Sequence, residues 1–388
     1  MHVAYLIPTI DRIGGAEQQV ISLARGLTLR GWKVSVIALS GSGGDAVSKL
    51  TAMGIGFRSL RMRKGLADPR GWIRLHSWMT KNRPDVVHAH LPHAALMARW
   101  SRLGSPVRAL IDTIHSPATG RPVRKLCYRV TAAIPNLVTA VSNTVAESWL
   151  TSGALNDTNL AVIPNGVDAS QWKPDDNIRT AMRRDLHLSD KFLWLAVGRL
   201  DPVKDHATLL RAFSRLSTDA RLVIAGTGPL QNQLNLLANE LGIGDRVQFL
   251  GFEPHVVRWM RAADGFVLSS HCEGLPLALI EACASELPSV ITGIAGALEV
   301  LPDPLRTSSV PVQDADALAE AMNCVMRMPA SERRDRGRFA RESIAERFSL
   351  DAVLDQWEAL YSEGLQRNPQ PSRLGKSWLP LGRTFQLQ

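Results

Sequence analysis

The stretch FLWLAVGRLDPVKD, residues 192–205, decides the fold class. Six consecutive apolar residues lead through a glycine into a charged loop and then an amphipathic segment, which predicts a buried strand followed by a helix. The same alternation runs through nearly the whole chain, with further apolar runs near 3–7, 33–39, 55–60, 85–89, 108–113, 137–141, 160–163, 221–225, 247–250, 265–268 and 288–291. Continuous apolar strands separated by helices predict an α/β fold whose parallel sheets are covered on both faces.

The polar stretch KPDDN, residues 173–177, interrupts this rhythm, which then starts again. Since a domain usually takes ~100–200 residues, the 388-residue chain is expected to hold two doubly wound, Rossmann-like domains, over 1–172 and 173–347. Such domains bind ligands at the carboxyl ends of their strands, so a cleft is expected where the two sheets face each other. A final helix is expected over 348–365, and 366–388 is expected to be a disordered or attachment segment.

The composition, with 45% hydrophobic and 21% charged residues, excludes a disordered or fibrous protein. No apolar run approaches the ~18–20 residues needed to span a bilayer. The apolar run 3–7 is too short for the core of a signal peptide. The four cysteines form no CxxC pair, which favours reduced thiols in a cytoplasmic protein.

The net charge of +9 is spread unevenly, because residues 1–170 carry +11 and residues 171–388 carry −2. This asymmetry predicts an anionic partner for the first half: a membrane surface, a phosphorylated substrate or nucleic acid. Nucleic acid is disfavoured, because the sequence holds only 3 Tyr and 9 Phe and no run of aromatic residues typical of RNA-binding sheets.

Two glutamates mark the strongest candidate site, in DGFVLSSHCEGLPLALIEA, residues 264–282. Glu273 is placed in the loop after a strand, and Glu281 one to two turns into the next helix. Gly274 allows a tight turn, and Pro276 fits a first helical turn. The free N–H groups of that helix suit a diphosphate, and two carboxylates beside it could hold sugar hydroxyls. Both glutamates could equally be ordinary turn and surface residues.

A pair of cations follows the strand 192–197. Arg199 and Lys204 could hold a diphosphate leaving group, and Asp205 can cap the helix that follows. Ordinary loop charges are the alternative. Gly14 and Gly15 form a further glycine-rich turn from strand to helix, where a ligand could approach the backbone or where the chain simply turns.

Histidines end two strands of the first half. Zinc binding by His88, His90, His93 and His115 is conceivable, but a hydrogen bond from such a histidine to a sugar or leaving group fits the strand-end positions better.

A basic stripe lies further on, where Arg121, Arg124, Lys125 and Arg129 share one helical face and Val123, Leu126, Cys127 and Val130 the other. That face is typical of contact with anionic headgroups, or of a merely solvated surface.

The order of these motifs resembles that of the GT-B glycosyltransferases of the large retaining family 4, over roughly residues 1–365. The resemblance rests on Gly14-Gly15-Ala16-Glu17, His90, His115, Val141-Ser142, Asn165-Gly166-Val167-Asp168, Gly198-Arg199-Leu200 with Lys204, Gly226-Thr227-Gly228-Pro229, Gly251-Phe252 and Glu273-x7-Glu281. The chain departs from the family pattern at two places. Glu286-Leu287-Pro288 lacks the glycine that usually precedes the proline, and the loop Gly293–Glu299 keeps one glycine before its glutamate where a pair is common.

The resemblance implies a role for each site residue. Arg199 and Lys204 would bind the donor diphosphate, Glu281 the ribose hydroxyls and Glu273 the donor sugar. Backbone N–H groups of Gly274 and Leu275 would face phosphate or sugar, and His90 would contact the sugar near the bond that breaks. Gly14 and Gly15 would form the loop over the diphosphate and acceptor, and the last helix would return to the first domain.

The resemblance, together with these motifs, implies a retaining, metal-independent glycosyltransferase that uses a nucleotide-diphosphate sugar and needs no cofactor. The acceptor is expected to be a glycan or a lipid-linked glycan, contacted by His115, Arg121, Arg124 and Lys125 of the basic half. The enzyme is expected in the cytoplasm, with peripheral contact to an anionic membrane. A nucleotide-sugar 2-epimerase and a non-catalytic nucleotide-sugar-binding protein are the alternatives, whereas the missing GxGxxG argues against an NAD enzyme.

Overall fold

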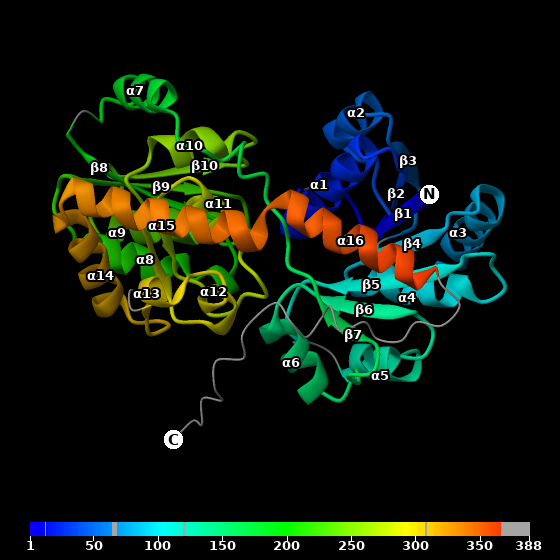
Figure 1. Cartoon of the computed structure of the whole chain (residues 1–388). Helices are drawn as coiled ribbons and strands as arrows, with labels where there is room; N and C mark the ends of the chain where they lie inside the picture. The colour runs from blue at the N-terminus through cyan, green and yellow to red at the C-terminus, as the bar shows by residue number, and fades with distance from the viewer. Residues whose placement is uncertain (12, 64–67, 119–121, 189, 307–308, 366–388) are drawn as a thin grey trace. The chain divides into compact units, whose positions relative to one another are not determined.

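The computed structural model describes the chain except for residues 12, 64–67, 119–121, 189, 307–308 and 366–388 (Figure 1). The contacts divide the chain into two compact units. Unit 1 is Met1–Gly166 with the segment that begins at Val353, and unit 2 is Val167–Ala352. The disordered or attachment segment expected at 366–388 lies outside the described residues.

Unit 1 is built on a seven-stranded parallel sheet in the order β3-β2-β1-β4-β5-β6-β7. Its strands are β1 His2–Ile7, β2 Lys33–Ala38, β3 Gly56–Ser59, β4 Val86–His90, β5 Ala109–Ile114, β6 Leu137–Ala140 and β7 Leu160–Val162. Its helices before the unit boundary are α1 Gly15–Leu29, α2 Gly44–Ala52, α3 Pro69–Asn82, α4 Pro92–Arg102, α5 Pro122–Val130 and α6 Asn143–Thr151. The central strands β1 and β4 are buried along their whole length, because helices cover both faces of the sheet.

The last helix, α16 (Leu350–Gly364), packs on unit 1 through most of its length. Trp357 and Tyr361 are buried, and the Tyr361 hydroxyl lies 3.2 Å from the hydroxyl of Tyr5 on β1. On the outside, Glu358 accepts hydrogen bonds from the Trp32 indole at 2.7 Å and from Arg30. The last helix, α16, is therefore part of the same hydrophobic core as β1, the first strand.

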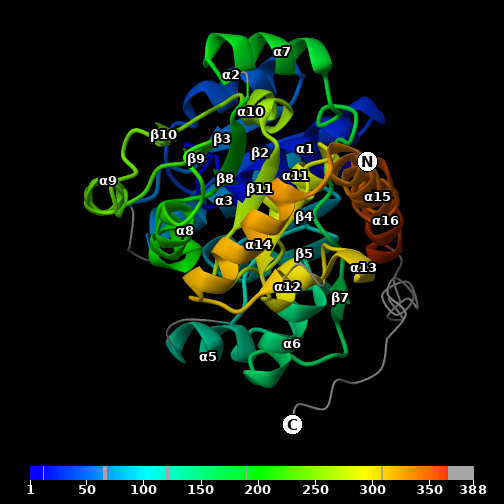
Figure 2. The same cartoon turned by 90° about the vertical axis from the view of Figure 1, so that its left-hand side faces the viewer.

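Unit 2 repeats the plan with a six-stranded parallel sheet in the order β10-β9-β8-β11-β12-β13. Its strands are β8 Phe192–Val197, β9 Ala220–Ala225, β10 Val247–Gly251, β11 Gly265–Leu268, β12 Ser289–Thr292 and β13 Ser309–Val310. Its helices are α7 Asp176–Asp185, α8 His206–Ser214, α9 Gln231–Glu240, α10 Val256–Ala262, α11 Leu277–Ala284, α12 Ala295–Leu298, α13 Asp303–Arg306, α14 Ala315–Arg327 and α15 Ala330–Phe348 (Figure 2). A short 3-10 turn, Pro202–Lys204, precedes α8. The parallel α/β architecture predicted from the sequence is confirmed in both units.

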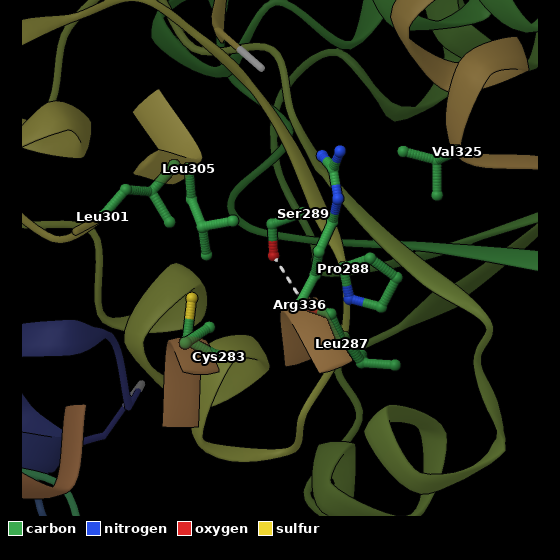
Figure 3. A pocket seen from close by; sticks show the side chains of 9 residues that line it. Cys283, Leu287, Pro288, Ser289, Leu301, Leu305, Val325 and Arg336 are labelled. Atoms are coloured by element: carbon green, nitrogen blue, oxygen red, sulfur yellow. Dashed lines mark hydrogen bonds between the residues drawn. The ribbon is translucent and has the colours of Figure 1, made fainter. Parts of the chain in front are cut away.

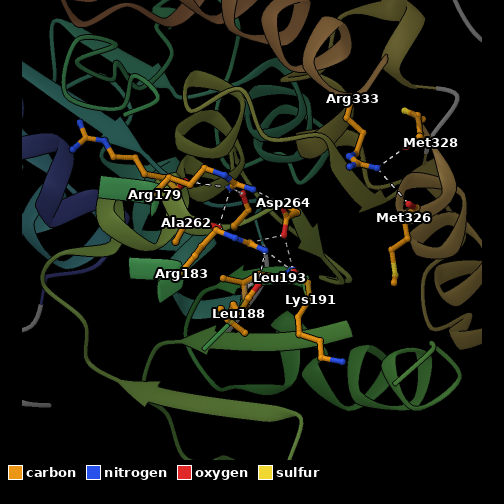
Figure 4. A network of polar contacts seen from close by, with 12 residues as sticks. Arg179, Arg183, Leu188, Lys191, Leu193, Ala262, Asp264, Met326, Met328 and Arg333 are labelled. Carbon is orange, nitrogen blue, oxygen red and sulfur yellow. Dashed lines mark hydrogen bonds and ion pairs between the residues drawn. The ribbon is translucent and has the colours of Figure 1, made fainter. Parts of the chain in front are cut away.

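An ion-pair network fixes α7 to the sheet of unit 2 (Figure 4). Asp264, just before β11, pairs with Arg179 and with Arg183, whose Nη1 lies 2.8 Å from the carboxylate. The same carboxylate accepts the backbone N–H of Leu193 at 2.8 Å. One half-buried acid thus joins a helix to two neighbouring strands.

The stretch 173–177 is not an irregular linker along its whole length. Asp175 caps α7 by accepting the N–H of Ile178 at 3.0 Å, so the helix begins inside the stretch. The contacts place the unit boundary between Gly166 and Val167, whereas the sequence predicts a boundary after residue 172. A polar stretch is also what an exposed helix N-terminus requires, because Asp and Asn are good N-caps.

Candidate active site

The loop that follows β8 carries the two cations predicted to bind a diphosphate. Gly198 continues the strand by donating to Ala225 O at 3.0 Å, and Leu200 donates to Thr227 O at 3.1 Å. Asp205 adopts a left-handed conformation (φ 45°) and caps α8 by accepting the N–H of Thr208, as predicted. The loop is therefore held at both ends before any ligand binds.

Glycines of the neighbouring loop make this arrangement possible. A Cβ on Gly226 would lie 1.9 Å from the carbonyl oxygen of Gly198, and one on Gly228 would lie 2.1 Å from that of Leu200. Gly226 also has a φ of 151°, which side chains rarely allow. The backbone of the 198–200 loop lies directly against these two glycines, and their lack of a side chain leaves room for it.

Lys204 and Glu273 are in direct contact. The Lys204 ammonium forms an ion pair with Glu273 Oε1, and the Ser270 hydroxyl donates to the same oxygen at 2.7 Å. Both side chains are largely buried, with 20% of Lys204 and 14% of Glu273 exposed. The loops that carry them follow the adjacent strands β8 and β11 and are joined by a bond from Ser269 Oγ to Lys204 O at 2.9 Å.

Arg199 lies on the same loop but points to solvent, with 71% of its side chain exposed. Its Nε is 3.4 Å from Asp201 Oδ2, and the structure shows no ion pair between Arg199 and either glutamate. Such an exposed pair contributes little stability, so the guanidinium can leave it at small cost to reach a ligand.

Glu281 lies in the second turn of α11, whose N-cap is Pro276. Burial raises the pKa of Glu281 to about 8. Among the described residues, no side chain or backbone group forms a hydrogen bond or ion pair with its carboxylate. A half-buried carboxyl without a protein partner is suited to a ligand that brings its own hydrogen-bond donors.

The start of α11 is packed against a second loop. A Cβ on Gly296, in α12, would lie 2.4 Å from Glu273 O and 2.7 Å from Gly274 O. This close approach fixes the turn made by Glu273, Gly274 and Leu275, of which Leu275 is buried. Of the two glycines in residues 293–299, Gly296 is thus the one at which the turn leaves no room for a side chain.

In unit 1, Gly14 is the N-cap of α1 at the carboxyl end of β1. Its N–H donates to Glu17 Oε2 at 3.0 Å, and a Cβ on Gly14 would lie 2.9 Å from that oxygen. Gly15 is the first residue of the helix. The motif is therefore a helix start closed by its own glutamate, and burial raises the pKa of Glu17.

The two histidines His90 and His115 form a pair at the ends of β4 and β5. His90 Nδ1 lies 2.9 Å from His115 Nε2, while His90 Nε2 is buried without a partner. Burial lowers the pKa of both, that of His115 to about 4, so both rings are neutral at neutral pH. The free nitrogen of His90 is the kind of group that a bound ligand satisfies.

His88, considered as a zinc ligand from the sequence, has both ring nitrogens occupied. Nδ1 is 2.7 Å from the Tyr361 hydroxyl and Nε2 is 2.6 Å from Thr113 Oγ1. Its ring also lies 4.1 Å from that of His90, centroid to centroid. In the part of the chain that the structure describes, no group of three His, Cys, Asp or Glu side chains is arranged to hold a metal ion.

Two family models match the chain and together cover most of it. "Glycosyltransferase Family 4" matches residues 13–171, and "Glycosyl transferases group 1" matches residues 178–343. The chain belongs to glycosyltransferase family 4. Each model falls almost entirely in one structural unit, so the family assignment covers both sheets of this glycosyltransferase.

Curated relatives and solved structures agree with this assignment. The glycosyltransferase is 27% identical over 271 residues to the Escherichia coli UDP-Gal:alpha-D-GlcNAc-diphosphoundecaprenol alpha-1,3-galactosyltransferase, covering 66% of this chain and 70% of the relative. It is 29% identical to a Campylobacter jejuni N-acetylgalactosamine-N,N'-diacetylbacillosaminyl-diphospho-undecaprenol 4-alpha-N-acetylgalactosaminyltransferase, over 63% of this chain and 65% of the relative. Anabaena HepE in complex with UDP and glucose has the same fold, with a TM-score of 0.83, 18% identity and coverage of 93% and 99%.

The residues expected to contact an acceptor divide into two groups. His115 is joined to His90, whereas Arg124 and Lys125 lie half-buried on α5. Arg121 lies outside the described residues. No described contact joins α5 to the histidine pair, so the structure does not bring these residues of the glycosyltransferase together.

A small apolar cavity of about 20 Å³ lies elsewhere in unit 2 (Figure 3). It is lined by residues of α11, α14 and α15 and the segments between them, including Cys283, Leu305 and Arg336. The cavity is only large enough for about one water molecule, and none of the candidate site residues lines it. It is a packing defect behind α11 and not a ligand site.

Proposed function

We propose that this glycosyltransferase moves a sugar from a nucleotide-diphosphate donor to a lipid-linked glycan, with retention of the anomeric configuration and without a metal ion. The observation that carries the proposal is the Lys204–Glu273 ion pair in unit 2. It joins the loop that carries Arg199 to the turn before α11. The relatives support it, because two of them are named for transfer to diphosphoundecaprenol-linked sugars and HepE was crystallised with UDP.

The donor diphosphate would bind to the two cations, Arg199 and Lys204. Arg199 can turn from Asp201 toward a phosphate, and Lys204 already lies at the edge of the sheet beside α11. As the bond between the anomeric carbon and the phosphate lengthens, negative charge grows on the diphosphate. Fixed cations and the N–H groups of Gly274 and Leu275 at the helix start would stabilise that charge in the transition state. They would do so in place of a divalent ion.

The carboxylates would hold the two sugars of the donor. Glu281, with a carboxyl that has no protein partner, is suited to the two ribose hydroxyls. Glu273 has one oxygen taken by Lys204 and Ser270, which leaves the other for a hydroxyl of the transferred sugar. The position of this carboxylate is therefore set by the same lysine that would bind the leaving group.

In unit 1, His90 would hydrogen-bond the donor through its free Nε2, close to the reacting carbon. Since His90 and His115 share one hydrogen bond, the proton on that bond decides whether Nε2 donates or accepts. The Gly14–Gly15 turn would form the loop over the diphosphate and the acceptor. An enzyme with these substrates would act at the cytoplasmic face of a membrane.

The test is a thermal-shift panel of nucleoside diphosphates and nucleotide sugars, followed by product analysis with the donor that it selects. A ligand that prefers the folded state raises the melting temperature. We expect one nucleoside diphosphate to stabilise the protein, and the anomeric coupling constant of the product to match that of the donor. Two results would contradict the proposal: no rise in melting temperature with any nucleoside diphosphate or nucleotide sugar of the panel, or isomerisation of the nucleotide sugar without an acceptor.

A further inference from the structure

Three adjacent helices of unit 1 expose large apolar side chains. The helices are α3, α4 and α5, and Figure 1 shows α4 lying between the other two. Seven of the fifteen exposed large hydrophobic residues of the described chain lie on or directly after them: Trp72, Ile73, Trp100, Leu103, Val123, Leu126 and Val130. Single exposed hydrophobic residues are normal, but this concentration on one helical layer marks an interaction surface.

Contacts between the helices hold them together as neighbours in one layer. From α3, the His76 ring stacks on Trp72, and its Nδ1 lies 3.3 Å from the carbonyl oxygen of Ser101 on α4. At the other side of α4, Arg102 donates to Ile134 O at 2.6 Å, four residues beyond the end of α5. We call the outer face of these three helices the docking surface.

Helix α5 is oriented with its aliphatic side outward. Val123, Leu126 and Val130 follow one another at helical spacing and are 69%, 59% and 68% exposed. The only buried residue of this helix is Tyr128, which packs under the Arg99 guanidinium at 4.3 Å. The aliphatic stripe therefore takes no part in the core of unit 1, and its apolar surface stays in contact with water.

The charge of the docking surface identifies the partner. Within α3, α4 and α5, all of whose residues are described, the sequence holds eight Lys and Arg and no Asp or Glu. Arg99 is buried and paired with Asp112, so seven of these cations belong to the docking surface. On α5, Arg124 and Lys125 flank the aliphatic stripe with half-buried stems. A partner must therefore be anionic and must also accept aliphatic and indole side chains.

An anionic bilayer meets both requirements, because its headgroups attract cations and its acyl chains receive apolar side chains. Trp72 and Trp100 are of the residue type that prefers the level of the headgroups. A second copy docked through the same surface would bring cations against cations. Nucleic acid offers phosphates but no apolar layer for Leu126.

We propose that the docking surface binds an anionic phospholipid bilayer, with Val123, Leu126 and Val130 inserted at the interface and Arg124 and Lys125 on the headgroups. Among the described residues, no helix is long and apolar enough to cross a membrane, so this contact is a peripheral one. The proposal rests on the proposed function in one respect: it places a membrane where a lipid-linked acceptor would be.

The experiment is flotation of the full chain with vesicles of phosphatidylcholine, alone or mixed with phosphatidylglycerol. We expect binding to the mixed vesicles only, falling with added salt. Arg124→Glu with Lys125→Glu should weaken partitioning by at least about 25-fold, from about fivefold for each cation lost. Replacing Val123, Leu126 and Val130 by Ser should weaken it about tenfold or more.

Matched variants control for charge and hydrophobicity alone. Arg327→Glu with Arg334→Glu changes the net charge equally on exposed positions of unit 2, and Leu29→Ser with Leu236→Ser removes exposed aliphatic side chains elsewhere. Both controls should float like the unmodified protein. Because every substituted side chain is on or near the surface, unchanged thermal melting will show that each variant is folded.

Three results would overturn the proposal: no flotation of the unmodified protein, flotation that the docking-surface variants leave unchanged, or a dimer in solution that the Ser variants dissociate. Transfer to a water-soluble acceptor analogue separates this failure from that of the proposed function. The variant that replaces Val123, Leu126 and Val130 by Ser should retain this transfer, because these exposed side chains are not among the candidate site residues. Transfer without flotation refutes only the surface, and flotation without transfer refutes only the proposed function.

Discussion

Replacing Lys204 by Ala tests the centre of the proposed mechanism. In the structure the ammonium pairs with Glu273, so the substitution has two effects: it removes a cation from the diphosphate site, and it leaves a largely buried carboxylate with Ser270 as its remaining partner. An experiment that measures activity alone cannot separate these effects. Combining the substitution with Glu273→Gln does so, because the amide oxygen of a glutamine at this position keeps the hydrogen bond from Ser270 without the charge.

The two effects differ in size. The unpaired carboxylate should lower the free energy of unfolding by about 1–3 kcal/mol, less than the ~3–5 kcal/mol of a fully buried pair because 20% and 14% of the side chains are exposed. Loss of a fixed positive group aimed at the leaving group should lower kcat by ~10²–10³-fold. The double variant should recover the stability and keep the loss of kcat.

The assays are denaturant unfolding and release of nucleoside diphosphate from the donor that the thermal-shift panel selects. Glu273→Gln alone sets the reference for both measurements, and Arg327→Ala controls for the loss of one surface cation. If the double variant turned over as fast as Glu273→Gln, the only role of Lys204 would be to neutralise the glutamate. Near-normal turnover of a folded Lys204→Ala protein would also refute the leaving-group role.

Three further outcomes follow from the structure of unit 2. Asp264→Ala should lower the free energy of unfolding by about 3 kcal/mol or more in denaturant melts, because two arginines and a backbone N–H lose their acceptor, whereas Asp219→Ala, an exposed partner of one lysine, should cost under about 1 kcal/mol. Gly226→Ala should abolish the stabilisation by nucleotide in thermal shift, since its Cβ would collide with Gly198 O at 1.9 Å. Burial raises the pKa of Glu281 from 4.5 to about 8, so the folded state holds a proton that the unfolded state releases; stability should fall as pH rises from about 4.5 to about 8, and Glu281→Gln should flatten that fall in pH-dependent melts.

Much of the fold could be predicted from the sequence, because in a parallel sheet the strands are continuous apolar runs. The predicted strands 192–197 and 265–268 match β8 and β11 residue for residue. The position of the cations and of Glu273 followed from the same rule, since loops after adjacent parallel strands meet at one edge. The helix α7 was harder to predict, because its polar first turn has the composition of a linker.

Contacts between distant segments could not be predicted in this way. The sequence shows that Gly226 and Gly228 lie in a turn, but only the fold shows that the backbone of the 198–200 loop occupies the space beside them. The pairing of His90 with His115 likewise depends on the register of β4 against β5, which an apolar run does not encode. The local sequence pattern predicts whether a segment forms a strand or a helix. The contacts of each polar group depend on which segments lie beside it in the fold.

Helix α5 shows the same principle from the outside. Its sequence has one basic and one aliphatic face, and burial of the aliphatic face is what an amphipathic helix usually predicts. The fold instead uses Tyr128 as the buried residue, because the Arg99 side chain, itself paired with Asp112 at 2.7 Å, offers its guanidinium to the tyrosine ring. With Tyr128 on the buried side of the helix, Leu126 faces outward and is 59% exposed. The outward aliphatic stripe thus accompanies the packing of Tyr128 on the buried Arg99–Asp112 pair, and its exposure has a cost in free energy that a membrane partner would offset.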